Sequence, residues 1–122
     1  MDTKIAIVDD EPDILTTYSR MLLNMGFPRP VLFTDGTSLI DALSSGEATF
    51  DVILMDYRIP EMNGLEAAKI VRRYRPEIKI ILATGSPIEE LAASEGFSYL
   101  RKPFSMKTLA KNIQEILGIQ RD

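Results

Sequence analysis

Five apolar runs alternate with helical patterns along this chain of 122 residues, and this alternation constrains the fold more than any other feature. The runs cover residues 4–8, 31–34, 51–55, 78–83 and 97–100. The first, third and fourth runs are continuously apolar, which is typical of strands covered on both faces. Regular alternation of strand and helix predicts an α/β fold, in which helices cover both faces of one open, doubly wound parallel sheet.

The helical patterns between the runs carry apolar residues at helical spacing. The first pattern extends to Gly26 and its apolar positions form one stripe: Ile14, Leu15, Tyr18, Met21, Leu22 and Met25. Shorter stripes occur over 36–45 and 65–73, and a last helix is expected from Ser105 to Gly118. We find no repeat or linker, so residues 1–122 are expected to form one domain.

Composition excludes several classes of function. The net charge is -4, which argues against a nucleic-acid surface, and the short basic run at residues 72–75 is interpreted as a solvated helix end. Cysteine and histidine are both absent, so chemistry must use carboxylates, lysine, hydroxyls or an oxygen-bound cation. We expect a soluble cytoplasmic protein, because no apolar segment approaches membrane-spanning length and the first residues do not form a signal peptide.

Polar side chains follow four of the five apolar runs. They are Asp9 and Asp10 after the first run, Asp56 after the third, Thr84 after the fourth and Lys102 after the fifth. Because ligands of open α/β sheets bind at the carboxyl ends of the strands, we expect these side chains to lie together. Three carboxylates in one cleft repel each other, and a hard divalent cation offsets this repulsion. The sequence therefore predicts a solvent-open Mg²⁺ site at this edge.

A metal, a carboxylate, a hydroxyl and a lysine at one point indicate phosphoryl transfer. Asp56 can attack phosphorus to give an acyl phosphate, while Lys102 neutralises charge on the equatorial oxygens and Thr84 donates a hydrogen bond. The chain contains no histidine and so cannot hold a phosphoryl group on an imidazole nitrogen. The donor must therefore be another protein or a small phosphorylated molecule.

Each of these residues taken alone also has a structural interpretation. Acids before a helix, such as Asp10 and Glu11, are typical of capping residues and of residues that interact with the helix dipole. Asp56 suits a turn, Thr84 suits a loop before a helix, and Lys102 suits an exposed surface. Their joint placement at the strand ends favours the functional interpretation, since several independent coincidences would otherwise be needed.

Four motifs make the chain resemble the response-regulator receiver domains of two-component signalling: IVDDEP, DVILMDYRIPEMNGLE, IILATGS and YLRKPF. The resemblance covers about residues 3–118 and implies a flavodoxin-like five-stranded sheet of strand order 2-1-3-4-5. It implies that Asp56 is the phospho-acceptor and that Lys102 pairs with the phosphate. It also implies that Mg²⁺, or Mn²⁺ in its place, is bound by Asp9, Asp10, Asp56 and the backbone carbonyl of Arg58.

The resemblance assigns roles to further residues. Thr84 and Tyr99 are expected to form a conformational switch, although Tyr99 alone also suits a half-buried aromatic on an outer strand. Arg58 and Ser86 occupy positions that tune the rate of dephosphorylation. Structural roles are implied for Gly64 and for Pro103, which is expected to follow a cis peptide bond.

The fourth helix departs from the family pattern. Ser86 is predicted to cap it, Pro87 to take its first position and Glu89 to complete a capping box, with Gly96 ending a helix of about nine residues. Only 17 residues separate Thr84 from Lys102, fewer than the family usually has. Because this helix belongs to the family's usual dimerisation and output surface, the oligomeric state is left open.

The resemblance implies a signalling switch that catalyses only its own phosphorylation and dephosphorylation. The expected partners are a sensor histidine kinase or phosphotransfer protein and a downstream target or output domain, with no nucleic acid or membrane. One alternative is a pseudo-receiver that binds partners without phosphorylation. Another is a phosphatase, which would need a second acid where Arg58 stands. The chain ends at Gln120-Arg121-Asp122, and the sequence leaves open whether it is a complete regulator or part of a longer one.

Overall fold

The computed structural model describes residues 2–118, which form five strands and five helices in strict alternation. The elements are β1 (Ile5–Val8), α1 (Pro12–Asn24), β2 (Val31–Phe33), α2 (Gly36–Ser44), β3 (Val52–Met55), α3 (Gly64–Tyr74), β4 (Lys79–Thr84), α4 (Glu89–Ser94), β5 (Ser98–Arg101) and α5 (Met106–Leu117). The predicted alternation is confirmed, and apart from α4 the boundaries agree within a few residues. The terminal segment Gln120–Asp122 lies outside the described residues.

The five strands form one parallel sheet in the order β2-β1-β3-β4-β5, which confirms the predicted flavodoxin-like topology. Val8 at the end of β1 lies opposite Met55 at the end of β3. The next residues, Asp9 and Asp56, therefore leave the sheet side by side. The backbone N–H of Asp56 still donates to the carbonyl of Val8 at 3.0 Å, so the sheet continues to hold the chain at this point.

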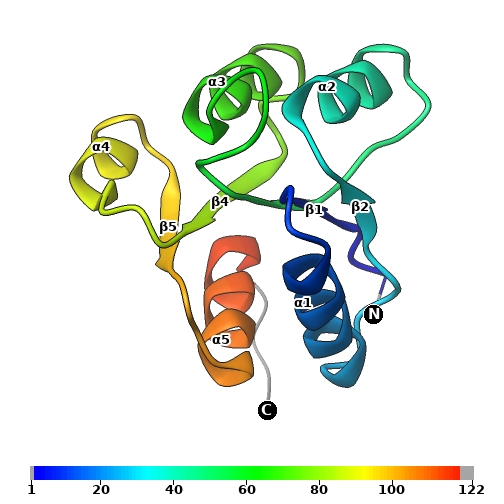
Figure 1. The fold of residues 1–122 in the computed structure, drawn as a ribbon. Helices are drawn as coiled ribbons and strands as arrows, with labels where there is room; N and C mark the ends of the chain where they lie inside the picture. The colour runs from blue at the N-terminus through cyan, green and yellow to red at the C-terminus, as the bar shows by residue number, and fades with distance from the viewer. Residues whose placement is uncertain (1, 119–122) are drawn as a thin grey trace.

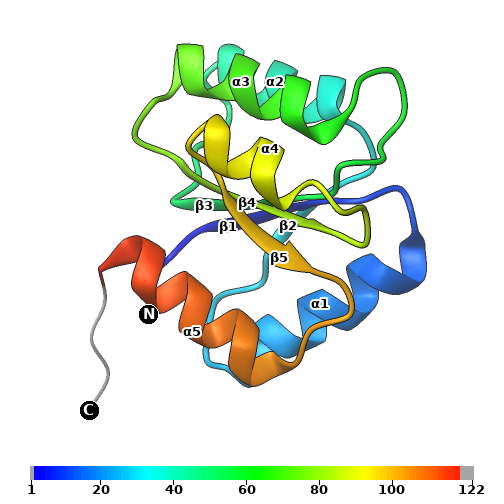
Figure 2. The same cartoon turned by 90° about the vertical axis from the view of Figure 1, so that its left-hand side faces the viewer.

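Helices cover both faces of the sheet, with α1 and α5 on one face and α2, α3 and α4 on the other (Figures 1 and 2). Alternate residues of the central strands contribute to the two cores. In β1, Ile5 and Ile7 belong to the core under α1 and α5, whereas Ala6 and Val8 belong to the opposite core. Burial on both sides explains why these strands are continuously apolar. Among residues 2–118, no helix has the length and apolar character needed to cross a membrane.

Helix α4 differs from the sequence prediction. It contains six residues, Glu89–Ser94, its N-cap residue is Ile88, and no side chain caps it. The predicted Ser86 capping box is therefore wrong. Ser86 belongs to the preceding loop, where its N–H donates to the Thr84 hydroxyl at 3.2 Å and its carbonyl accepts from the Tyr99 hydroxyl at 2.8 Å. The local hydrogen bond to Thr84 and the tertiary hydrogen bond to Tyr99 hold Ser86 in this loop, before the start of the helix.

A group of polar contacts joins α3 to the turn after α4. The Arg72 guanidinium lies over the Phe97 ring, 4.4 Å from its centroid, and also donates to the backbone carbonyl of Glu95. The Glu95 carboxylate pairs with Lys69 at 3.2 Å and with Arg72 at 3.7 Å. Arg72 and Arg73 are exposed in the last turn of α3, which confirms the interpretation of a solvated helix end for these two residues. What the sequence did not predict is that Arg72 also contacts Phe97 and Glu95, which come from a distant part of the sequence.

Candidate functional site

Three carboxylates meet where β1 and β3 end. One oxygen from each of Asp9, Asp10 and Asp56 lies within 4.8 Å of the others. Asp9 is 1% exposed and Asp56 is 8% exposed, whereas Asp10 lies at the surface. Carboxylate oxygens are the ligands that hard divalent cations prefer, and one exposed ligand suits a cation that keeps several waters. This donor set therefore fits the predicted divalent metal.

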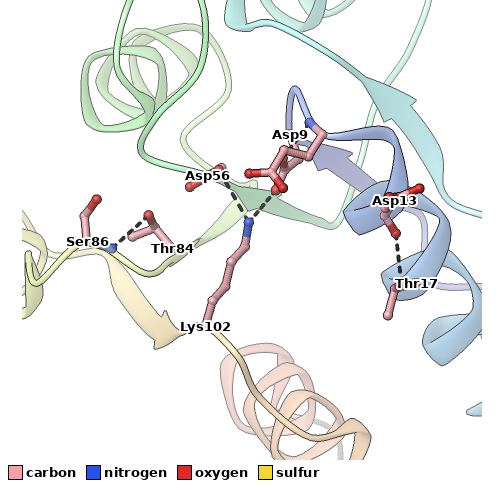
Figure 3. Close-up of polar contacts among 8 residues, drawn as sticks. Asp9, Asp13, Thr17, Asp56, Thr84, Ser86 and Lys102 are labelled. Atoms are coloured by element: carbon pink, nitrogen blue, oxygen red, sulfur yellow. Dashed lines mark hydrogen bonds and ion pairs between the residues drawn. The ribbon is translucent and has the colours of Figure 1, made fainter.

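Lys102 reaches the same carboxylates from the loop after β5, as Figure 3 shows. Its Nζ forms an ion pair with Asp9 Oδ2 and lies 3.4 Å from Asp56 Oδ2. Burial alone would lower the pKa of Lys102, but its hydrogen bond to Asp9 and the charges of Asp56 and Asp9 outweigh burial and raise this pKa above its ordinary value. The ammonium therefore stays charged beside the acids.

Backbone hydrogen bonds beyond the strand ends fix these residues. The N–H of Asp9 donates to the backbone carbonyl of Phe33 at 3.0 Å, and the N–H of Lys102 donates to the backbone carbonyl of Thr84 at 3.0 Å. The Asp9 carboxylate also accepts from the N–H of Glu11 at 3.0 Å. The backbone at Asp9 and at Lys102 is thus held by continuation of the sheet hydrogen bonding, which limits the movement of the main chain that carries these side chains.

Thr84, Ser86 and Tyr99 form a hydrogen-bonded chain beside the acids. The Thr84 side chain is nearly buried, and its hydroxyl accepts from the N–H of Ser86 (Figure 3). The Tyr99 hydroxyl on β5 donates to the carbonyl of the same Ser86. The Thr84 hydroxyl and the Tyr99 hydroxyl on β5 therefore both bind the backbone of Ser86, in the loop after β4.

Gly64 and Pro103 shape the loops around the site. A Cβ atom on Gly64 would lie 2.1 Å from the backbone oxygen of Asp56, so no side chain fits there. The N–H of Gly64 donates to the backbone carbonyl of Tyr57 at 2.7 Å, and this hydrogen bond holds the start of α3 close to the end of β3. The peptide bond between Lys102 and Pro103 is cis, as the resemblance predicted.

An open hollow of about 540 Å³ gives access to these groups. Its lining includes Asp10, Asp56, Arg58, Thr84, Ser86 and Lys102. The structure thus brings together the residues predicted from the strand ends, with Arg58 and Ser86 at the rim. The structural alternatives gain little support at two residues, because Lys102 has a side chain only 15% exposed and Glu11, although it is the N-cap residue of α1, forms no side-chain cap. The local hydrogen bond from Ser86 to the Thr84 hydroxyl does agree with a loop role for Thr84.

Comparison with protein families decides the identity of this fold and site. Residues 5–114 match the family described as the response regulator receiver domain. The chain belongs to this family. The match includes the ends of all five strands, and it agrees with the strand order and with the acidic cluster at the carboxyl edge of the sheet.

Several receiver-containing proteins are similar to this chain. Regulatory protein AtoC of Escherichia coli is 31% identical over 96% of this chain and 26% of its own length. The receiver domain of sensor histidine kinase PA1611 from Pseudomonas aeruginosa, solved with magnesium in its active site cleft, is 31% identical with a TM-score of 0.80, covering 97% of this chain and 99% of that one. Response regulator TrrA from Thermotoga maritima, solved with Mg²⁺-BeF, is 26% identical with a TM-score of 0.83, covering 94% and 99%. This receiver domain spans about an eighth to a half of the length of the curated relatives compared with it.

The sequence patterns missed one residue beside the site of this receiver domain. Tyr18 is predicted only as part of the apolar stripe of α1, and it is indeed buried there. Its ring also lies 5.7 Å from Lys102 Nζ and is stacked on Phe104. A phenol in an otherwise aliphatic stripe is the only signal in the sequence that could have indicated this contact.

Proposed function

We propose that this receiver domain is a phosphorylation-activated signalling switch in which Asp56 accepts a phosphoryl group. The observation that carries the proposal is the meeting of Asp56 with two further carboxylates, a charged lysine and a hydroxyl in one open hollow. No residue type in this set is unusual alone. Together they provide a nucleophile and the positive charge that phosphoryl transfer needs.

Asp9, Asp10 and Asp56 hold Mg²⁺ in this proposal, with the backbone carbonyl of Arg58 as a further ligand and Mn²⁺ as a substitute. The spacing and exposure of the three carboxylates support this assignment, and the PA1611 receiver domain carries magnesium in its cleft. The bound cation supplies positive charge that offsets the carboxylates and the phosphoryl oxygens.

The transfer is a displacement at phosphorus. An Asp56 carboxylate oxygen forms the new P–O bond while the bond from phosphorus to the donor breaks, and the donor leaves with its bonding electrons. Lys102 lies within 3.4 Å of Asp56 and neutralises charge on the transferred group. The signal ends by hydrolysis. A water molecule attacks phosphorus, the bond from phosphorus to the Asp56 carboxylate oxygen breaks, inorganic phosphate leaves and the carboxylate is restored. Arg58 and Ser86 at the rim tune this hydrolysis.

Thr84 and Tyr99 convert the chemical change into a conformational change. The Thr84 hydroxyl now accepts from Ser86, and a phosphoryl oxygen on Asp56 gives that hydroxyl a second partner, to which it donates. Movement of Thr84 changes the loop that also holds the Tyr99 hydroxyl. Phosphorylation thereby biases the surface made by α4, β5 and α5.

The donor is a sensor histidine kinase, a phosphotransfer protein or a small phosphodonor. Output occurs through binding of a protein target or through an output domain in a longer chain. The domain works in the cytoplasm, does not itself bind nucleic acid or membranes, and is not an enzyme in the metabolic sense, because it catalyses only its own phosphorylation and dephosphorylation.

Intact-mass measurement tests the proposal. The protein is incubated with acetyl phosphate and Mg²⁺, beside an Asp56→Asn variant and a sample containing EDTA. We expect a single phosphoryl increment that requires the metal and is absent from the variant. Because the sequence contains no tryptophan, mass is a better readout than intrinsic fluorescence.

Two outcomes would contradict parts of the proposal. An increment that persists in Asp56→Asn would place the phospho-acceptor elsewhere. No increment with either acetyl phosphate or a phosphorylated histidine donor, under conditions that label a control receiver, would favour the pseudo-receiver alternative.

A further inference from the structure

The Lys102 ammonium has an aromatic partner as well as its acidic ones. Its Nζ lies over the Tyr18 ring, 5.7 Å from the centroid, and the same atom forms ion pairs with the Asp9 and Asp56 carboxylates. A cation within about 6 Å of a ring centroid is attracted to the face of the ring. The Lys102 ammonium thus contacts two carboxylates and one aromatic face.

The Tyr18 ring is itself fixed. It is 5% exposed and is stacked on Phe104, with centroids 4.6 Å apart and an interplanar angle of 21°. Phe104 follows the cis peptide bond between Lys102 and Pro103 by one residue. The ring therefore contacts the lysine segment at two points, at the ammonium and at the aromatic residue two positions later.

We propose that Tyr18 is a positioning residue for phosphoryl transfer, and that its ring keeps the Lys102 ammonium within ion-pair distance of the Asp9 and Asp56 carboxylates. The inference rests on the proposed function, because it assigns to Tyr18 a role in the reaction of the same site. Tyr18 stands outside the four sequence motifs that carry the family resemblance, and it contacts Lys102 from α1.

The flexibility of lysine gives the contact its importance. A lysine ammonium is a point charge on a flexible four-carbon stem, so its position must come from its surroundings. Once Asp56 carries a phosphoryl group, the Lys102 ammonium has to form ion pairs with the phosphoryl oxygens while its contacts with the carboxylates change. The Tyr18 ring is a partner whose position does not depend on the state of Asp56.

The phenol also suits this role electrostatically. Burial raises the pKa of Tyr18, and the nearby Asp9 and Asp56 charges raise it further, against the opposing effect of Lys102. The hydroxyl therefore stays neutral and adds no negative charge beside the phosphoryl oxygens. The ring face, not the hydroxyl, is the feature that contacts the ammonium, so phenylalanine should replace tyrosine in this function.

The test compares Tyr18→Phe and Tyr18→Leu with wild type, with Leu22→Ala as the matched control. Leu22 is fully buried on the same face of α1, one turn beyond Tyr18, and so reports loss of packing alone. The limiting rate of phosphorylation and the half-saturating concentration are measured with acetyl phosphate. The NMR shift of the Lys102 ε-methylene, which a neighbouring ring displaces, is measured without donor, and Mg²⁺ affinity is measured by titration.

We expect Tyr18→Leu to lower the limiting rate about three- to tenfold, the range that a partly desolvated cation–ring contact corresponds to. The Lys102 shift should move towards the value of an exposed lysine, while the Mg²⁺ affinity stays within about twofold because Tyr18 is not a metal ligand. Tyr18→Phe should retain the wild-type rate and shift.

Three results would overturn the inference. The first is an unchanged limiting rate in Tyr18→Leu, and the second is an equal loss of rate in Leu22→Ala. The third, which needs no variant to fold, is a wild-type Lys102 ε-methylene shift equal to that of an exposed lysine. If wild type accepts no phosphoryl group at all, the proposed function fails, and the Lys102 shift still decides whether Tyr18 holds the ammonium.

Discussion

Replacing Gly64 with alanine tests how closely the start of α3 approaches the backbone of the proposed phospho-acceptor. The new Cβ would lie 2.1 Å from the carbonyl oxygen of Asp56 and 2.9 Å from its carbon, whereas ordinary contact begins near 3.4 Å. Relief requires a displacement of about 1.3 Å between two backbone segments. Alanine gains at most about 1 kcal/mol from helix propensity, and less at the first helical position.

The displacement has to break or lengthen existing backbone hydrogen bonds. The N–H of Gly64 donates a hydrogen bond to the carbonyl of Tyr57 at 2.7 Å, and the N–H of Asp56 donates one to the carbonyl of Val8 at 3.0 Å. Overpacking costs about 1–3 kcal/mol and a lost hydrogen bond about 1 kcal/mol, so the unfavourable contact outweighs the gain in propensity. We expect Gly64→Ala to lose about 3 kcal/mol of stability.

Urea denaturation and phosphorylation kinetics measure the two consequences. The urea midpoint of Gly64→Ala should fall with an unchanged slope, and the phosphorylation rate should fall about 100-fold, since a shift near 1 Å misplaces the Asp56 carboxylate. Gly85→Ala is the matched control because a Cβ there meets nothing within 4 Å, and its stability should stay within about 0.5 kcal/mol of wild type. An unchanged urea midpoint in Gly64→Ala would refute the reasoning.

Three further predictions concern the site and its surroundings. Lys102→Met leaves the buried Asp9 carboxylate without its cation and should cost about 3 kcal/mol in EDTA, a loss that Mg²⁺ reduces; a melting temperature no more Mg²⁺-dependent than that of wild type would contradict this. Tyr99→Phe removes one hydrogen bond to the loop after β4 and should cost about 1 kcal/mol by urea denaturation, whereas the exposed Tyr74→Phe should cost nothing measurable. Arg72→Ala removes the Arg72 contacts between α3 and the turn after α4, so amide exchange in that turn should quicken while exchange in β1 stays unchanged; equal exchange in the variant and wild type would show that the Arg72 contacts do not hold the turn.

The alternation of strands and helices, the helix stripes and the meeting of the acids at one edge were predictable from the sequence patterns, whereas the strand order followed from the family resemblance. Continuous apolar runs identify central strands, and a parallel sheet brings their carboxyl ends together regardless of the loops between them. Asp9 and Asp56 could therefore be placed side by side, although 46 residues lie between them. The Lys102 contact followed for the same reason, since Lys102 comes just after the last strand.

The start of α4 was not predictable because local and tertiary preferences compete there. Ser86 and Glu89 match a capping box, but Thr84 and Tyr99 take the backbone groups of Ser86 instead. Contacts such as those of Arg72 with Phe97 and of Tyr18 with Lys102 join distant elements through side-chain directions. No spacing rule within one element reports such directions.

The length and attachment of α4 limit how far it can carry a signal. Six residues of helix extend about 9 Å, and the turn that follows is tied to α3 through Arg72. A rigid rod pivoting about that tie by, for illustration, about 20° would move its N-terminal end by only about 3 Å, compared with about 5 Å for a helix of ten residues. In the proposed switch, a partner that distinguishes the two states would therefore have to recognise a small displacement near Glu89 and Glu90, and a binding surface that requires a larger displacement of a longer helix would not detect it.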